Sequence, residues 1–284
     1  MNAPAVTGIF DPKTNTISYL VVDEKTKHGA IIDSVLGYDA ASGRTDTIRA
    51  DEMIALVEKE GVSVEWILET HIHADHLSAA PYLKGRLGGK IAMGRHINEV
   101  GRVFNELFNT DGASPAFDHL FEDGELFSLG NLAAKALHTP GHTPACMTYL
   151  VGDAAFVGDT LFMPDFGTAR TDFPGGDAKT LYHSIKRILA LPPSTRLFTG
   201  HDYKAPGRDD FRWETTVAEQ RANNVHISDE KTEEDFVHLR QTRDAQLSVP
   251  ALMIPSVQVN IRAGTLPDPE ANGRRYIKIP IDSL

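Results

Sequence analysis

The sequence has a single cysteine, no long apolar run and no excess of basic residues, and each shortage excludes a class of protein. Cys146 has no second cysteine with which to form a disulfide within the chain, so nothing indicates an oxidising compartment. No stretch of about 18 residues is apolar, and residues 1–10 lack a basic leader pattern, so we expect a cytoplasmic protein that does not interact with membranes. The 28 Lys and Arg are outnumbered by 39 Asp and Glu, a net charge of −11, and nucleic acid is therefore not an expected partner.

Histidine, by contrast, is plentiful, with 12 among 284 residues. The 41% of hydrophobic residues is enough for a large core. Short β-branched or apolar runs alternate with helical patterns, as in residues 28–35, 49–61 and 64–69, and this order is typical of an α/β fold. Because no low-complexity linker interrupts the pattern, we expect a single domain over residues 1–284, built from two similar halves.

The densest group of potential metal ligands is His71-Ile72-His73-Ala74-Asp75-His76, which follows the strand-like residues 66–70. In an extended chain alternate side chains point to the same side, so His71 and His73 would face one space that Asp75 and His76 reach from the turn. A polar loop with solvated histidines is the plain alternative. Such close packing of His and Asp residues favours a metal site instead.

Three further junctions after predicted strands carry the same residue types. Pro140 and Gly141 oppose a helix, so only one histidine of this turn is expected to bind a metal; His142 is favoured, and His138 is interpreted as structural. Asp159 ends a buried-looking strand, where a helix cap is its alternative role. His201 follows another strand. Loops of this kind gather at one edge of a sheet. His and Asp ligands from separate loops, without a cysteine cluster, therefore predict an open catalytic site for zinc or iron and not a closed structural site.

Other kinds of active site find little support in the sequence. Cys146 is a candidate nucleophile, but a lone cysteine beside Met147 is interpreted as part of the core. There is no Gly-x-Ser-x-Gly elbow, and residues 175–180 lack the glycine that a phosphate-binding loop needs before its lysine. A metal-stabilised binding scaffold without catalysis is a further alternative, although structural sites seldom carry surplus ligands.

Together, the run from His71 to His76, the Thr-Pro-Gly-His142 turn, Gly158-Asp159 and Gly200-His201-Asp202 resemble the metallo-β-lactamase superfamily over about residues 15–205. The resemblance implies an α/β fold of the αβ/βα sandwich type. In it, two mixed sheets are flanked by helices and the metal lies at one edge of the sheets. Superfamily membership does not fix the reaction.

A narrower resemblance, to the persulfide dioxygenases, is carried by residues 170–173, residues 178–184 and His201-Asp202-Tyr203. It implies one Fe(II) per chain, held by His71, His142 and Asp159. Two His and one carboxylate leave three positions of a ferrous ion open, enough for a persulfide and O2. The other metal-site residues of the superfamily would orient ligands, water or substrate; here they are His73, Asp75, His76 and His201.

Those four residues would also supply the second metal position of a hydrolase. The alternative is therefore a glyoxalase II-like thioester hydrolase with two Zn(II). Glyoxalase II enzymes typically carry an aromatic stretch after the metal-binding Asp, and this sequence lacks it. The preferred prediction is oxidation of glutathione persulfide, or of a similar low-molecular-weight persulfide, by O2 to sulfite and free thiol in sulfide detoxification.

Substrate binding is assigned to Arg170, Tyr203, Arg221 and His226. His226 stands where the alignment places the arginine that anchors glutathione in the family. A neutral imidazole donates one hydrogen bond and cannot grip a carboxylate bidentately, so we expect a weak, pH-sensitive anchor that Arg221 or Arg170 compensates. Residues 247–284 form a C-terminal extension that is longer than in the human relative. The oligomeric state stays open, with a homodimer as one alternative.

Overall fold

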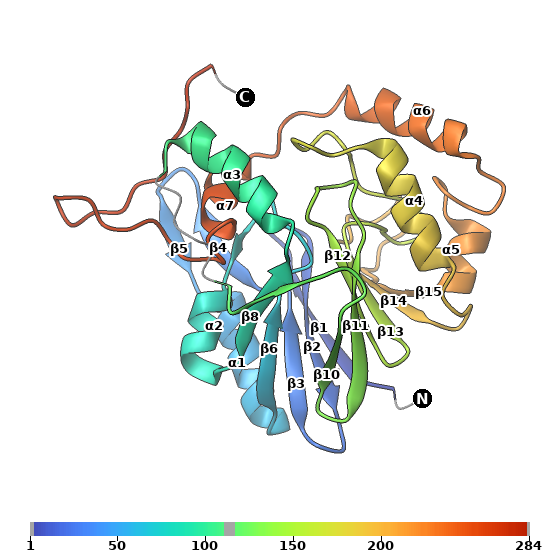
Figure 1. Ribbon diagram of the computed structural model, residues 1–284, viewed down its shortest axis with the longest axis horizontal. Helices are drawn as coiled ribbons and strands as arrows, with labels where there is room; N and C mark the ends of the chain where they lie inside the picture. The colour runs from blue at the N-terminus through green and yellow to red at the C-terminus, as the bar shows by residue number, and fades with distance from the viewer. Residues whose placement is uncertain (1–2, 111–116, 283–284) are drawn as a thin grey trace.

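The computed structural model describes residues 3–110 and 117–282, which form two β-sheets packed face to face with helices on the outer faces (Figure 1). Each large sheet has six strands, and a third, small sheet has three. Both large sheets contain parallel and antiparallel neighbours. The predicted αβ/βα sandwich of two mixed sheets is therefore confirmed.

The first large sheet has the strand order β1-β2-β3-β6-β8-β9. Its first three strands are antiparallel neighbours, whereas β3, β6, β8 and β9 run parallel to one another. Parallel neighbours need crossover connections, and α1, α2 and α3 lie in these crossovers. The elements of this half are β1 (Ala5–Asp11), β2 (Thr16–Asp23), β3 (His28–Ile32), α1 (Ile48–Glu60), β6 (Ser63–Leu68), α2 (Ala80–Leu87), β8 (Lys90–Gly94), α3 (Ile97–Phe108) and β9 (His119–Phe121).

The second large sheet has the order β10-β11-β12-β13-β14-β15. Only β13 and β14 are parallel neighbours in it, and α4 lies in their crossover. The small sheet has the order β5-β4-β7. The remaining elements are β4 (Val35–Asp39), β5 (Arg44–Asp46), β7 (Leu77–Ser78), β10 (Leu126–Leu129), β11 (Leu132–His138), β12 (Met147–Val151), β13 (Ala154–Gly158), α4 (Ala178–Leu189), β14 (Arg196–Thr199), β15 (Glu214–Thr216), α5 (Val217–Asn223), α6 (Glu233–Asp244) and α7 (Met253–Asn260).

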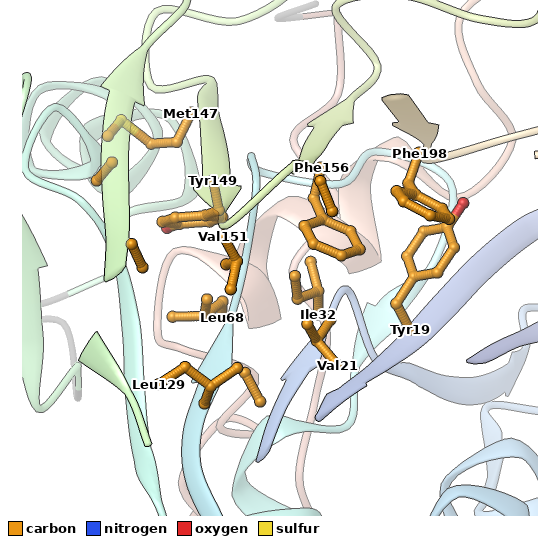
Figure 2. Packing of buried hydrophobic residues seen from close by; sticks show 14 of the residues in the cluster. Tyr19, Val21, Ile32, Leu68, Leu129, Met147, Tyr149, Val151, Phe156 and Phe198 are labelled. Atoms are coloured by element: carbon orange, nitrogen blue, oxygen red, sulfur yellow. The ribbon is translucent and has the colours of Figure 1, made fainter. Parts of the chain in front are cut away.

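The main core lies between the two large sheets (Figure 2). Side chains of β2 alternate, so Tyr19 and Val21 face the second sheet while Leu20 and Val22 pack beneath the helices. This burial on both faces explains why β2 reads as one continuous apolar run. Figure 2 shows Tyr19, Val21, Ile32 and Leu68 of the first sheet opposite residues of the second sheet, namely Tyr149, Val151, Phe156 and Phe198.

Helix α4 begins after an aspartate cap and ends shortly before a pair of prolines. The side chain of Asp177 accepts a hydrogen bond from the Thr180 amide, and the helix ends at Leu189, before Pro192. Its apolar face, including Leu181 and Ile185, packs on the second sheet. At the start of the helix, the amide of Asp177 donates to the carbonyl of Gly141, the residue before His142. Helix α4 is thereby connected to the loop that carries part of the site described below.

The C-terminal residues contain one more buried helix. Helix α7 lies against α3 and β7, and nearly all of its residues are buried. After it, residues 261–282 form neither helix nor strand. In the ranges that the structure covers, no helix is long and apolar enough to cross a membrane.

Candidate metal centre

Three ligand atoms from three separate loops meet at one edge of the two sheets. His71 follows β6, His142 lies between β11 and β12, and Asp159 follows β13. The Nε2 atoms of His71 and His142 each lie 3.8 Å from Oδ2 of Asp159, and all three ligand atoms lie within 4.8 Å of one another. The three residues are buried. We call them the triad.

Hydrogen bonds fix the imidazole of His142 with its free nitrogen toward the centre. Its Nδ1 donates to the main-chain carbonyl of Arg170 at 2.8 Å. Because a neutral imidazole carries one proton, Nε2 is left with a lone pair. The expected choice of His142 over His138 agrees with this placement, since Nε2 of His138 donates to the carbonyl of Pro144.

A hydrogen-bond relay fixes His71 in the same way. The hydroxyl of Thr70 donates to Asp33 at 2.7 Å, so its oxygen accepts the proton on Nδ1 of His71 at 2.9 Å. Nε2 of His71 therefore faces Asp159 with a free lone pair. Burial and the neighbouring His73 lower the pKa of His71 well below its usual value, which keeps the ring neutral. Partners that fix the tautomer of a ligand in this way are typical of metal sites.

His201 holds the third member of the triad. Its Nδ1 lies 2.7 Å from Oδ1 of Asp159, and its Nε2 lies 2.8 Å from Asp75. Burial disfavours the charged imidazole, but the carboxylates of Asp159 and Asp75 outweigh it and raise the pKa of His201 well above its usual value. The hydroxyl of Thr16 also lies within 3.3 Å of Asp75, His76 and His201.

His73 is close to the triad but does not join it. The His71 and His73 rings lie 4.1 Å apart, yet Nε2 of His73 is between Asp33, at 3.1 Å, and Glu69, at 3.2 Å. Burial opposes the charge, but these two carboxylates raise the pKa of His73 to about 10. The two rings lie side by side, as expected, but their Nε2 atoms have different partners: that of His71 faces Asp159, and that of His73 faces Asp33 and Glu69.

The donor set fits a metal ion. The triad offers two neutral imidazole nitrogens and one carboxylate oxygen, which suits iron or zinc. Two more buried nitrogens, Nδ1 of His73 and Nε2 of His76, have no hydrogen-bond partner in the described ranges, and His73, Asp75 and His76 form a second group of adjacent potential ligands. An orphaned buried polar atom is costly, so its retention suits a site built for an ion.

Asn260 of α7 holds the loop after His71 in place through hydrogen bonds. Its side-chain amide donates to the carbonyls of His73 at 2.9 Å and His76 at 2.8 Å, and its oxygen accepts from the amide of Ser78. Sequence analysis missed Asn260, since an asparagine far from the ligand motifs gives no local signal. The C-terminal residues therefore help to shape the candidate site.

A cavity of about 230 Å³ adjoins the triad. Among its lining residues are the ligands His142 and Asp159 and the apolar side chains of Phe162 and Phe166. Three of the predicted substrate-binding residues also line it, namely Arg170, Tyr203 and His226. Helix α6 also contributes residues to the lining, and Figure 1 shows this helix next to α4.

Two of these residues are held by strong contacts of their own. The guanidinium of Arg170 pairs with Asp172 and donates to the carbonyl of Ser248. The ring of Tyr203 stacks on His201 with centroids 5.4 Å apart. Both residues therefore present fixed surfaces to the cavity.

His226 is more buried than the sequence suggested. Its Nδ1 accepts from the amide of Thr168 at 3.0 Å, so the ring proton is on Nε2. Burial, together with Arg240 and Arg243, lowers the pKa of His226 to about 4. The expected pH-sensitive binding through this ring needs correction, because the ring stays neutral at pH 6 and above.

The expectation for Arg221 is corrected as well. Arg221 pairs with Asp229 on the surface and does not line the cavity. Two arginines of α6, Arg240 and Arg243, line it instead. Sequence analysis did not select them, although their spacing of three residues puts them on one face of a helix such as α6.

The chain is similar to a known protein family and to several known proteins. Residues 13–201 match the family model of the metallo-beta-lactamase superfamily. A "Probable metallo-hydrolase" of Burkholderia pseudomallei is 57% identical over 293 residues, which cover 98% of this chain and 99% of that protein. "Glyoxylase B2" of Dictyostelium discoideum is 49% identical over 271 residues, or 93% and 92% of the two chains.

Proteins that bear the name ETHE1 are also similar to this chain. The human "Persulfide dioxygenase ETHE1, mitochondrial" is 31% identical over 259 residues, which cover 88% of each chain. The crystal structure of ETHE1 from Myxococcus xanthus aligns with a TM-score of 0.75 and 29% identity, covering 92% of this chain and 100% of that one.

Proposed function

The chain belongs to the metallo-beta-lactamase superfamily, and we propose that it is an iron-dependent persulfide dioxygenase with one Fe(II) per chain. Its substrate is glutathione persulfide or a similar low-molecular-weight persulfide, and its role is sulfide detoxification. The similarity to the human persulfide dioxygenase and to the Myxococcus xanthus structure supports this choice within the superfamily.

One observation carries the proposal: the triad converges as a group of three, while Nε2 of His73 and both nitrogens of His201 face carboxylates. In His73 this nitrogen is held by Asp33 and Glu69. A set of two imidazoles and one carboxylate is typical of mononuclear iron oxygenases, because it leaves positions free for two reactants.

The overall reaction balances without a further oxidant. One persulfide, RSSH, one O2 and one water give the thiol RSH, sulfite and two protons. The S–S bond breaks, the terminal sulfur is oxidised to sulfite, and O2 is the species reduced. Iron held by the triad supplies the binding and activation of both the sulfur and O2.

The chain's own residues position the reactants. Arg170 and Thr70 orient His142 and His71, and His201 keeps one oxygen of Asp159 occupied, so that Oδ2 alone faces the centre. The rings of Phe162 and Phe166 give the cavity apolar walls. Walls of this kind limit water near the reacting sulfur and favour attack by O2 over hydrolysis.

A binuclear Zn(II) thioester hydrolase of the glyoxalase II type is the second candidate. Asp75, His76 and His201 lie next to the triad, with Asp75 2.8 Å from His201 and 3.2 Å from His76. The names of the relatives at 57% and 49% identity also favour a hydrolase.

Parallel assays separate the two candidates. Protein prepared with iron alone and with zinc alone is given glutathione persulfide and S-lactoylglutathione. The proposal expects O2 uptake with equimolar sulfite from the iron form and little thioester hydrolysis from either form. Efficient thioester hydrolysis by the zinc form, without O2 uptake by the iron form, would establish the hydrolase.

A further inference from the structure

One wall of the cavity presents three nitrogen donors side by side. Arg240 and Arg243 are three residues apart on α6 and share a face of that helix. His226 and Arg240 both contact Thr168, through the Thr168 amide and the Thr168 carbonyl respectively. All three residues line the cavity that also contains His142 and Asp159. We call Arg240, Arg243 and His226 the donor wall.

Each member of the donor wall has a donor group without an acceptor. The guanidinium of Arg243 is exposed and makes no ion pair or hydrogen bond with residues 3–110 or 117–282. The guanidinium of Arg240 is held in the wall by its donation to Thr168 and Asp244, and its Nε is buried without a partner and has no surface open to the cavity. Nε2 of His226 carries the ring proton and has no partner within the same ranges.

The charges around the cavity leave one cation unbalanced. Arg170 is paired with Asp172, and Arg240 with Asp244. Within residues 3–110 and 117–282, Arg243 has no such counterion, although the net charge of the chain is −11. A wall that offers only N–H donors and one surplus positive charge suits a ligand group that is anionic and accepts hydrogen bonds, as a carboxylate does.

We propose that Arg243 binds a carboxylate of the thiol carrier, with the N–H groups of Arg240 and His226 beside it, so that the chain selects anionic low-molecular-weight persulfides. The inference rests on the proposed function for the sulfur end of the substrate, which faces the triad. The carboxylate end is placed by the donor wall itself. In this chain the anchoring guanidinium thus comes from α6 and not from position 226.

The fixed contacts of the other candidates favour Arg243 as the anchor. Arg170 already holds Asp172 and a main-chain carbonyl, so it has few free donors. Arg221 is paired with Asp229 outside the cavity. Of these three arginines, Arg243 combines a place in the cavity wall with a guanidinium that has no partner among the described residues. A planar guanidinium can bind a carboxylate through two parallel hydrogen bonds.

Calorimetric binding of reduced glutathione tests the inference without turnover. The metal-loaded wild type, Arg243→Gln and Arg243→Lys are titrated anaerobically with glutathione and with its diethyl ester. Arg221→Gln is the matched control, because it removes a guanidinium outside the cavity. Circular dichroism and thermal melting verify that each variant is folded.

We expect Arg243→Gln to weaken glutathione binding by about tenfold or more, since a charged hydrogen bond is lost. Arg243→Lys should fall between it and the wild type, and Arg221→Gln should stay within about twofold of the wild type. The wild type should bind the diester about tenfold more weakly than glutathione, with no further loss in Arg243→Gln. In O2 uptake with glutathione persulfide, Arg243→Gln should raise KM and leave kcat unchanged.

Three results would overturn the inference: no binding of glutathione by the wild type, equal binding by wild type and Arg243→Gln, or an equal loss in Arg221→Gln. The titration is independent of the reaction. If the protein binds glutathione through Arg243 but consumes no O2, the proposed dioxygenase function fails while the carboxylate anchor stands.

Discussion

Nδ1 of His201 lies 2.7 Å from Oδ1 of Asp159, and this contact assigns separate tasks to the two oxygens of one carboxylate. Oδ1 is held by His201, whereas Oδ2 lies 3.8 Å from the Nε2 atoms of His71 and His142. His201 therefore orients a ligand of the triad and is itself tied at its other nitrogen to Asp75. A ligand and the residue that orients it should respond differently to substitution.

Metal content should divide the site residues into two groups. Replacing His71, His142 or Asp159 by Ala removes one of three ligands, so these variants should retain almost no iron. Replacing Asp75 or His201 by Ala leaves the triad intact, and such variants should bind iron about 10–100-fold more weakly but still load at saturating metal. Plasma mass spectrometry on dialysed samples, with a chelator competition, measures both. If Asp75→Ala is as empty as His142→Ala at saturating iron, Asp75 is itself a ligand.

Asn260 should matter to the metal although it lies in α7. Asn260→Ala removes the hydrogen bonds to the carbonyls of His73 and His76, and each buried polar group left unpaired costs about 1–3 kcal/mol. We expect metal affinity to fall about 10–100-fold. Chelator competition measures the affinity, and urea unfolding measures the free energy of unfolding.

Gln258→Ala is the control for Asn260, because Gln258 belongs to the same helix but bonds Ile254 and Lys278. This variant should lose stability without losing metal affinity. An equal loss of affinity in both variants would mean that α7 acts only by general destabilisation.

The ligand residues could be predicted from the sequence because they are local. His71, His142 and Asp159 each follow or precede a strand in a short run of unusual composition, and strand ends meet at one sheet edge. Asn260 and Arg243 gave no such signal, since each is an ordinary residue that reaches the site only through the packing of a distant helix.

Burial and pairing explain the remaining errors. His226 and Arg221 lie close together in the sequence, and both were expected to bind substrate. In the fold, however, His226 is buried against Thr168 while Arg221 is on the surface with Asp229. The sequence does not reveal which side chain faces the cavity, because that choice depends on how residues 217–229 pack against residues 162–168.

His226 should make stability depend on pH in the acidic range. Its folded-state pKa of about 4 is below the unfolded value of about 6.5, so the unfolded chain binds the proton more readily between these values. The stabilisation is fully present above about pH 6.5 and is lost as the pH falls toward 4.

Urea unfolding at pH 7.0 and 4.5 checks this prediction. The wild type should lose about 2 kcal/mol more than His226→Gln between the two pH values, since Gln does not titrate. Equal losses in the two proteins would show that His226 titrates alike in the folded and unfolded chains. At pH 6 to 8 KM should show no titration from this ring.

Cys146 should be dispensable for catalysis. Its thiol is buried and in contact with Thr143, and burial raises its pKa to about 12, so the nucleophilic thiolate is absent near neutral pH. Cys146→Ser should retain iron and kcat, at a cost of about 1 kcal/mol in the free energy of unfolding. The native protein should also resist iodoacetamide. A drop of more than about tenfold in kcat with full iron content would assign Cys146 a catalytic role.

The iron content of anaerobically purified protein tests the central claim most directly. The triad provides three ligands for one ion, so the account predicts about one iron per chain, lost in His142→Ala. It also predicts that glutathione persulfide and O2 are consumed in equal amounts in the same sample. Two tightly bound zinc ions per chain, with thioesterase activity and no O2 uptake, would contradict it.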